Sequence, residues 1–179
     1  MFDSTPAPVV WFTGLSGAGK STIAKRVVDQ LRISGVATEW LDGDEVRSVL
    51  SPDLGFTRAD RDLQVTRLGY IASLLARNGV LTVVSAISPY RESREKALEM
   101  SKRSVLIHVH APLSVLEDRD TKGLYRRARE GSLQGLTGVD DPYESPMDPD
   151  LMIDTSAMTI DEAVAKVLLA VIPEGVQIG

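Results

Sequence analysis

Residues 14–21 read Gly-Leu-Ser-Gly-Ala-Gly-Lys-Ser, and this stretch decides the fold. It matches the pattern G-x-x-x-x-G-K-[ST], in which glycines let backbone N–H groups turn inward around phosphate oxygens. An apolar run at 8–13 precedes it, and residues 21–34 carry apolar side chains at helical spacing. A strand, a glycine-rich loop and a helix in this order place the loop at a helix N-terminus, which favours anions. The stretch therefore predicts a site for the phosphates of a nucleoside triphosphate, and we call it the phosphate loop.

Outward from this loop, apolar runs alternate with amphipathic stretches along the chain. We expect further strands over residues 36–41, 80–86, 105–110 and 151–153. We expect helices over 42–50 after a turn, 57–78, 88–102, 113–131 as one or two helices, and 159–171, with a long loop, the late loop, at 134–149. This alternation predicts an α/β protein with the three-layer P-loop NTPase fold. Its sheet would be five-stranded and mainly parallel, with helices on both faces and a small lid.

The composition is that of an ordinary globular domain. The 179 residues include 20 Lys+Arg and 25 Asp+Glu, giving a net charge of −5, and 43% are hydrophobic. We expect one domain over 1–179, with a loose lead-in at 1–7 and the lid and late loop at about 119–147. The acidic balance argues against a nucleic-acid binder, and the absence of cysteine excludes disulfides and thiolate chemistry. With no long apolar run and no basic leader, we expect a cytoplasmic protein that does not bind membranes.

Polar residues follow the expected strands, at the edge where parallel sheets bind ligands. Lys20 is expected to reach the β- and γ-phosphates of the nucleotide, and Ser21 to hold Mg²⁺. Asp42 and Asp44 follow the second strand. A kinase needs one carboxylate to orient or deprotonate the acceptor hydroxyl, and another can hold magnesium-bound water. Arg47 can pair with an anionic acceptor. The alternative is a helix-capping aspartate on a surface turn.

Two further segments leave alternatives open. Ser88 either bonds a substrate phosphate or caps the helix that follows it. Arg91 and Arg94 either bind phosphate or cover a solvated surface. Residues 119–129 hold five cations and one anion. This run is either a solvated charged face or a mobile lid that closes over the phosphates and excludes water.

Six segments in this order resemble the adenylylsulfate (APS) kinase family, and the resemblance spans residues 9 to about 171. The segments are 14–22, 41–47, 55–56 with 60–61, 87–91, 119–128, and 137–144 followed by Pro146. The family transfers the γ-phosphoryl group of MgATP to the 3′-hydroxyl of APS, giving PAPS and ADP in sulfate assimilation. The resemblance thus implies ATP and Mg²⁺ as cofactors, APS as substrate, a homodimer, and an association with ATP sulfurylase.

The resemblance also implies roles for single residues. It assigns ATP to Gly14, Leu15, Ser16, Gly17, Ala18, Gly19, Lys20, Ser21 and Thr22, and the metal to Ser21 and Asp42. It places Asp42 and Asp44 at the 3′-hydroxyl, and we favour Asp44 as the base without excluding Asp42. Bacterial members are often described as having a phosphoserine intermediate at the position of Ser88. We expect direct in-line transfer instead, because positioning and charge stabilisation suffice for phosphoryl transfer.

For the acceptor, the resemblance implies a pocket built from Arg47, Phe56, Arg61, Gln64, Ile87, Ser88, Lys122, Leu136 and Thr137. In this acceptor pocket, Phe56 would stack on the adenine of APS. Arg47 and Arg61 would hold the phosphosulfate, and Lys122 would bridge substrate and lid.

Two positions depart from the family. The family usually has Asn at Gln64 and Phe at Leu136. Gln keeps the amide but is one methylene longer. Loss of one aromatic face from an adenine sandwich would cost roughly 0.5–1.5 kcal/mol, or about tenfold in affinity. These departures support an alternative, a related P-loop kinase that acts on another nucleotide-like acceptor.

Two other classes fit the sequence less well. A nucleotide-switch GTPase usually carries N-K-x-D, whereas the single Asn of this chain, Asn78, precedes Gly79. A catalytically idle nucleotide-binding domain in an assembly would not need to retain the residues expected to do the chemistry, namely Lys20, Ser21, Asp42, Asp44 and Lys122.

Overall fold

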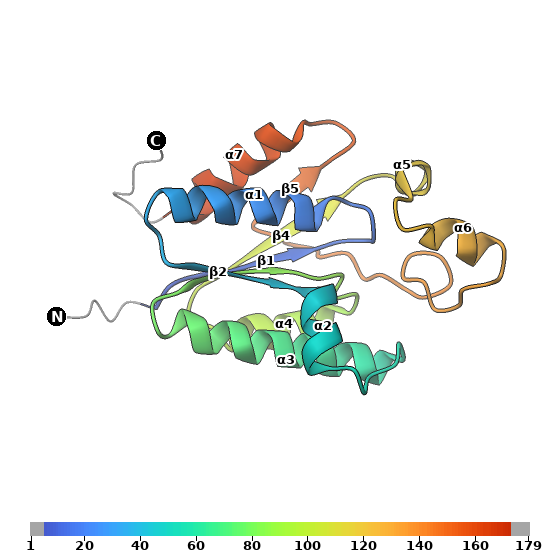
Figure 1. The fold of residues 1–179 in the computed structure, drawn as a ribbon, viewed down its shortest axis with the longest axis horizontal. Coiled ribbons are helices and arrows are strands. Elements are labelled where there is room, and N and C mark those ends of the chain that lie inside the picture. The colour runs from blue at the N-terminus through green and yellow to red at the C-terminus, as the bar shows by residue number, and fades with distance from the viewer. Residues whose placement is uncertain (1–5, 173–179) are drawn as a thin grey trace.

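The computed structural model describes residues 6–172, so residues 1–5 of the expected lead-in lie outside the described part. The sheet consists of five parallel strands in the order β2-β3-β1-β4-β5 (Figure 1). They are β1 (Val9–Thr13), β2 (Thr38–Asp42), β3 (Leu81–Ser85), β4 (Ser104–His110) and β5 (Leu151–Asp154). The predicted five-stranded sheet is confirmed, and every described pairing in it is parallel.

Helices cover both faces of this sheet, as the alternation predicts. One face carries α1 (Lys20–Ile33) and α7 (Ile160–Val171), and the other carries α3 (Arg58–Ala76) and α4 (Arg91–Glu99) (Figure 1). Three short helices, α2 (Gly43–Leu50), α5 (Leu113–Arg119) and α6 (Leu124–Arg129), lie beyond the carboxyl ends of the strands. Within residues 6–172, no helix combines the length and apolar character that a membrane crossing needs.

The central strand β1 fixes the phosphate loop because it is buried on both faces. Val10 and Phe12 pack under α1 and α7, whereas Val9 and Trp11 pack under α3. Burial of a large apolar side chain stabilises a fold by roughly 1.5–3 kcal/mol. The strand that leads into the phosphate loop is therefore held firmly from both sides.

Some helix starts follow local sequence signals, whereas α4 differs from the prediction. The expected capping box at Thr57 and Asp60 is present at the start of α3. The helix expected at 88–102 is instead α4, Arg91–Glu99, which begins three residues later and ends three residues earlier. Ser88 has a φ of +41° and precedes Pro89, so its backbone cannot be helical. The expectation that Ser88 caps this helix is also wrong, since Tyr90 occupies the cap position.

Candidate active site

The phosphate loop joins the end of β1 to the start of α1. At Gly14, which has a φ of +150°, an added Cβ would lie 2.0 Å from a carbonyl oxygen of β4, so only glycine fits. Lys20 is buried, and its Nζ donates a hydrogen bond to the Leu15 carbonyl oxygen at 2.8 Å. Burial lowers the pKa of Lys20 to about 8, although the nearby Asp44 carboxylate acts to raise it. The loop thus offers a helix N-terminus and one cation to a phosphate.

Asp42 ends β2 and gathers two hydroxyl groups at the carboxyl edge of the sheet. Its Oδ2 accepts hydrogen bonds from Ser21 Oγ at 2.7 Å and Ser85 Oγ at 2.9 Å. Its Oδ1 caps α2 by accepting from the Asp44 backbone N–H at 3.0 Å. Burial acts to raise the pKa of Asp42, but these hydrogen bonds outweigh it and hold the pKa below its ordinary value. Asp42 is therefore both a helix cap and an ionised member of the site.

A magnesium ion fits this group of oxygens. Hydroxyl and carboxylate oxygens are the ligands that Mg²⁺ takes, usually one or two from the protein with water and phosphate completing the shell. Ser21 Oγ and Asp42 Oδ2 already meet at 2.7 Å beside the phosphate loop. Among the described residues, no cluster of three or more His, Cys, Asp or Glu side chains could hold a metal alone.

Asp44, on the first turn of α2, contacts the segment between α5 and α6. Lys122 Nζ lies 2.5 Å from Asp44 Oδ2, although the two residues are 78 positions apart. Both side chains are largely exposed, so the pair contributes little to stability. Its consequence is positional, because it brings a cation from the expected lid against the expected base.

The basic segment at 119–129 divides into two parts. Arg119 donates to the Thr155 carbonyl oxygen at 2.6 Å, and the Tyr125 hydroxyl donates to the Ser16 carbonyl oxygen at 2.8 Å. These bonds tie α5 and α6 to the phosphate loop and the strand ends. The end of the segment is exposed, and Arg129 pairs with Glu117 on α5. The start of the segment therefore packs against the phosphate loop, and its end is a solvated face.

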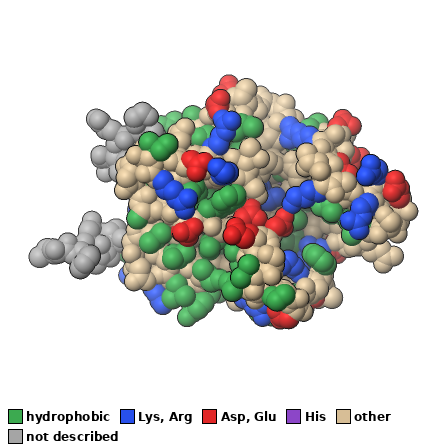
Figure 2. Space-filling view, viewed as in Figure 1, with side chains coloured by type: hydrophobic (Ala, Val, Ile, Leu, Met, Phe, Trp, Pro, Cys, Tyr) green, Lys and Arg blue, Asp and Glu red, His purple; other side chains and the backbone are tan. Residues whose placement is uncertain are grey.

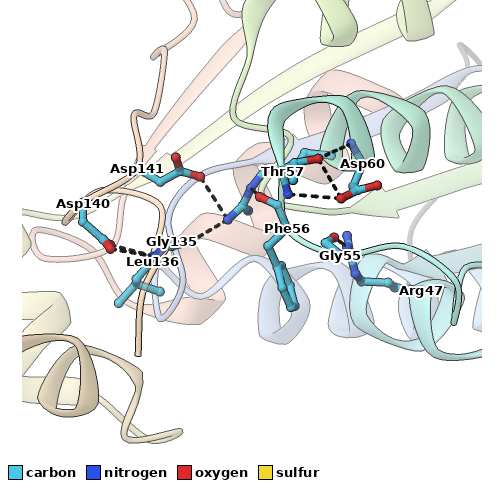
Figure 3. A network of polar contacts seen from close by, with 10 residues as sticks. Arg47, Gly55, Phe56, Thr57, Asp60, Gly135, Leu136, Asp140 and Asp141 are labelled. Atoms are coloured by element: carbon cyan, nitrogen blue, oxygen red, sulfur yellow. Dashed lines mark hydrogen bonds and ion pairs between the residues drawn. The ribbon is translucent and has the colours of Figure 1, made fainter. Parts of the chain in front are cut away.

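Phe56 lies in the loop between α2 and α3 (Figure 3) and lines the cavity at this edge of the sheet. Its ring is 65% exposed, and the guanidinium of Arg47 lies 4.5 Å from the ring centroid. Arg47 also donates a hydrogen bond to the Gly55 carbonyl oxygen. Arg47 therefore supports the loop and the ring, and it is not among the residues that line the cavity.

Arg61, on the first turns of α3, links the Phe56 loop to the late loop. It donates to the Phe56 carbonyl oxygen at 3.0 Å and to the Gly135 carbonyl oxygen at 2.6 Å. It also forms an ion pair with Asp141 at 3.1 Å. Arg61 is 8% exposed, so it acts as a rigid brace at the edge of the cavity.

The segment after β3 places Ile87 on the cavity and turns Ser88 away from it. Ser88 is buried, and its hydroxyl accepts a hydrogen bond from Trp11 Nε1 at 3.0 Å. The neighbouring Ile87 carbonyl oxygen accepts from Thr13 Oγ1 at 2.7 Å. The Ser88 hydroxyl is therefore engaged with the core rather than facing a substrate.

Arg91 and Arg94, three residues apart on α4, have different environments. Arg91 is exposed, whereas Arg94 is 1% exposed. Arg94 donates to the carbonyl oxygens of Ser88 and Glu144, each at 2.6 Å. The expectation that Arg94 covers a solvated surface is wrong, because the late loop packs over it.

The two positions that depart from the family pattern both lie inside. Gln64 is 6% exposed, and neither its Oε1 nor its Nε2 has a hydrogen-bond partner within the described chain. It does not line the cavity. Leu136, 7% exposed, lines the cavity beside Thr137 and packs with the core on the α1 side of the sheet.

These elements enclose one cavity of about 610 Å³ between the sheet edge, the lid and the late loop. Figure 2 shows acidic and basic side chains gathered near the centre of the face in view, beside the projecting lid. The expected site residues that line it are Ser16, Gly17, Gly19, Lys20, Ser21, Thr22, Asp42, Asp44, Phe56, Arg61, Ile87, Lys122, Leu136 and Thr137. Six expected site residues do not line it: Gly14, Leu15, Ala18, Arg47, Gln64 and Ser88.

Sequence reasoning missed several residues that shape the cavity. Ser85 pairs in register with Asp42 across neighbouring strands, and this pairing was the available signal. Tyr125 and Thr155 gave no local signal, because their partners are distant in the sequence. Tyr125 donates to Ser16, 109 positions away, and Thr155 accepts from Arg119, 36 positions away.

The late loop also touches the phosphate loop directly. Gly138 has a φ of +92°, and an added Cβ there would lie 2.7 Å from Leu15 Cδ2. Leu15 in turn supplies the carbonyl oxygen that holds Lys20. A single close contact thus joins the loop expected to bind the acceptor to the loop expected to bind the nucleotide.

A phosphate-binding helix start, an ionised carboxylate at the next strand end and a covering lid together define a kinase of the P-loop fold. The chain shares this fold with a sugar kinase from Janibacter sp., at 22% identity and a TM-score of 0.68 over 94% of this chain and 97% of that one.

The chain belongs to the adenylylsulphate kinase family, whose model matches residues 6–154. It is 52% identical to an adenylyl-sulfate kinase of Microcystis aeruginosa over 158 residues, 88% of this chain and 87% of that protein. It is also similar to the APS kinase of Mycobacterium tuberculosis, solved with AMPPNP and APS. That structure has a TM-score of 0.88 at 41% identity, covering 91% of this chain and 96% of that one.

Proposed function

We propose that this chain is an adenylyl-sulfate kinase, which transfers the γ-phosphoryl group of ATP to the 3′-hydroxyl of APS and forms PAPS and ADP in sulfate assimilation. The observation that carries the proposal is the shared cavity. Lys20, Asp44 and Lys122 line it together with Phe56 and Arg61, so one enclosed space joins a phosphate site to an aromatic platform.

On the donor side, residues 14–22 bind ATP. Ser21 and Asp42 hold Mg²⁺, which when bound neutralises charge on the transferred phosphoryl group. Lys20 supplies a cation to the same group, and its burial strengthens that interaction because less water competes. The lid excludes water, which would otherwise accept the phosphoryl group.

On the acceptor side, Phe56 stacks on the adenine through its exposed ring, beside the guanidinium groups of Arg47 and Arg61. Arg61, which lines the cavity, holds the phosphosulfate. Lys122 bridges the two substrates, moving from its contact with Asp44 toward the phosphate oxygens. Gln64 has a buried amide without a partner in the described chain but does not line the cavity, so its role on the acceptor side stays a prediction from the resemblance.

Transfer is direct and in line. Asp44 accepts the proton of the 3′-hydroxyl while the hydroxyl oxygen bonds to the γ-phosphorus. The bond between the γ-phosphorus and the β,γ-bridging oxygen breaks and releases ADP. Ser88 does not carry the phosphoryl group in this proposal. Its burial and its hydrogen bond from Trp11 support that assignment.

An ADP-release assay with MgATP tests the function. APS is compared with adenosine 5′-phosphate, a cytidine nucleotide and no acceptor, and the product is identified by mass. We expect release that depends on APS, with a product phosphorylated on its 3′-hydroxyl. Activity only with another acceptor would reject APS and favour the related kinase suggested by Gln64 and Leu136. Binding of AMPPNP without activity on any acceptor would favour an idle domain.

We also propose a single-domain, cytoplasmic homodimer. Its contact surface would lie on α2 and α3, where four large hydrophobic side chains are exposed: Val49, Leu50, Leu63 and Tyr70. Figure 2 shows hydrophobic side chains gathered over this part of the face in view. Sedimentation of wild type and of Leu63→Glu with Tyr70→Glu tests this surface, and the double variant should be a monomer. Association with ATP sulfurylase stays a prediction from the resemblance.

A further inference from the structure

Arg94 is a buried cation, and its hydrogen bonds to the described residues go to backbone carbonyl groups. It is among the largest fully buried side chains, and within residues 6–172 its guanidinium forms no ion pair. A buried charge is costly unless its donors are satisfied. The helix that carries it is otherwise strongly polar, so packing alone does not call for an arginine here. Its two partners therefore indicate what it does.

The first partner is the turn that follows β3. Arg94 Nη1 donates to the Ser88 carbonyl oxygen at 2.6 Å. Ser88 is the non-glycine residue with a positive φ, +41°, among the described residues. A backbone in this region persists only where its surroundings fix it. Arg94 fixes the carbonyl group, and Trp11 fixes the side chain at 3.0 Å. The turn sets the position of Ile87 at the cavity.

The second partner is the end of the late loop. Arg94 Nη2 donates to the Glu144 carbonyl oxygen at 2.6 Å. The Glu144 backbone N–H donates to the Pro89 carbonyl oxygen at 2.8 Å, and its carboxylate accepts from the Arg91 N–H at 2.7 Å. These bonds join residue 144 to the turn and to the start of α4.

The tie at Glu144 reaches the cavity through a stiff segment of the late loop. The Gly138 N–H donates to the Asp141 carbonyl oxygen at 2.7 Å, and Asp140 accepts from the backbone N–H groups of Gly135 and Leu136 at 2.6 and 2.7 Å. Residues 135–137 line the same cavity as Ile87. The guanidinium of Arg94 is therefore bonded directly to the turn, and it is linked to residues 135–137 through the chain of the late loop.

We propose that Arg94 is a positioning residue for the acceptor. It sets the spacing between Ile87 and residues 135–137 without touching either substrate. The proposal rests on the proposed function only for the identity of the acceptor. Charge-assisted hydrogen bonds are stronger than neutral ones, so no neutral side chain replaces both bonds. Lysine has a single ammonium group, which cannot span the two carbonyl groups with the fork geometry of a guanidinium.

Steady-state kinetics of Arg94→Met, Arg94→Lys and the matched control Arg91→Met test this role. In Arg94→Met we expect the KM for APS to rise at least tenfold and the Kd for AMPPNP to change less than twofold. Arg94→Lys should be intermediate. Arg91→Met removes an exposed side chain from the same helix and keeps its backbone bond to Glu144, so it should match wild type. An unchanged KM in Arg94→Met would overturn the proposal.

A second control separates positioning from general stability. Val164→Ala weakens the core under α7, on the opposite face of the sheet, and should lower thermal stability with an unchanged KM for APS. An equal rise of the KM for APS in Val164→Ala and in Arg94→Met would mean that Arg94 acts only through overall stability, and it would overturn the proposal.

Hydrogen exchange tests the same inference without any acceptor. In Arg94→Met we expect faster amide exchange in both segments, residues 86–90 and 134–144, and no change in the phosphate loop. Unchanged exchange in either segment would overturn the proposal. If wild type fails to phosphorylate APS, the proposed function fails, and the exchange result still decides the role of Arg94.

Discussion

Replacement of Gly43 by alanine would separate local stability from catalytic geometry. Gly43 begins α2, between Asp42 and Asp44, and its φ suits any residue. An added Cβ would lie 3.0 Å from Ala86 Cβ, 3.1 Å from the Ser85 carbonyl oxygen and 3.2 Å from Ala86 Cα. Carbon atoms prefer separations of about 3.5–4.0 Å. The start of α2 must therefore move away from the end of β3 by roughly 0.5 Å.

This displacement falls on the residue proposed as the base. Asp44 is held by its N–H bond to Asp42 at 3.0 Å, and the next bond, from the Glu45 N–H, is already 3.4 Å long. A displacement of about 1 Å in an active site costs about 10² in rate. Half of that predicts about a tenfold loss in kcat, or about 1.4 kcal/mol of activation free energy. Helix propensity acts in the other direction, because alanine stabilises helices by up to about 1 kcal/mol relative to glycine.

Coupled ADP release gives kcat, calorimetry gives the Kd for AMPPNP, and thermal unfolding gives stability. We expect kcat to fall about tenfold while the Kd and the stability of Gly43→Ala stay close to wild type. Adding Ala86→Gly removes the nearest clashing atom and should restore part of the rate, with Ala86→Gly alone as the control. A wild-type kcat in Gly43→Ala, or an equal loss of AMPPNP affinity, would refute the reasoning.

Three further predictions concern charge. Asp44→Asn should lower kcat by about 10²–10⁴ and change the Kd for AMPPNP less than about threefold, whereas equal turnover would remove Asp44 from the chemistry. Burial lowers the pKa of Lys20 to about 8, and bound phosphates favour its charged form. AMPPNP affinity should therefore fall as pH rises above 8, and calorimetry should show proton uptake on binding. Constant affinity from pH 7 to 9.5 would contradict this prediction. Burial, with His110 and Arg94, lowers the pKa of His108 from 6.5 to about 4. The unfolded chain then binds more protons across this window, so the free energy of unfolding should fall on acidification by at most about 3 kcal/mol. Urea unfolding at pH 7 and 4.5 should show a smaller fall in the free energy of unfolding for His108→Gln than for wild type. Equal falls in the two proteins would contradict the prediction.

Much of the fold follows from short-range patterns. Apolar runs gave each strand within about two residues, and the capping box at Thr57 marked the start of α3. The rule that ligands bind at the carboxyl ends of parallel strands brought Lys20, Asp42 and Ile87 to one cavity. These features depend on periodicity and topology, which a sequence carries locally.

The features that the sequence did not predict have a different physical origin. Arg94 lies in the polar stretch Arg-Glu-Ser-Arg-Glu, which is typical of a solvated helix, and its burial depends on a loop 50 positions away. The late loop has no periodic pattern, so neither its ties to α4 nor the ion pair of Asp141 with Arg61 could be predicted. Ser88 was predicted to cap a helix because no local pattern signals its positive φ, and its hydroxyl is engaged by Trp11, 77 positions away.

The contact between Gly138 and Leu15 limits how the two substrate sites can diverge. A change of acceptor by recombination would exchange the late loop between relatives, and the incoming residue at 138 would have to match the side chain already present at 15. A bulkier pair would press on the carbonyl group that holds Lys20. Residues 15 and 138 should therefore change together in evolution, and an engineered change of acceptor specificity should exchange both residues.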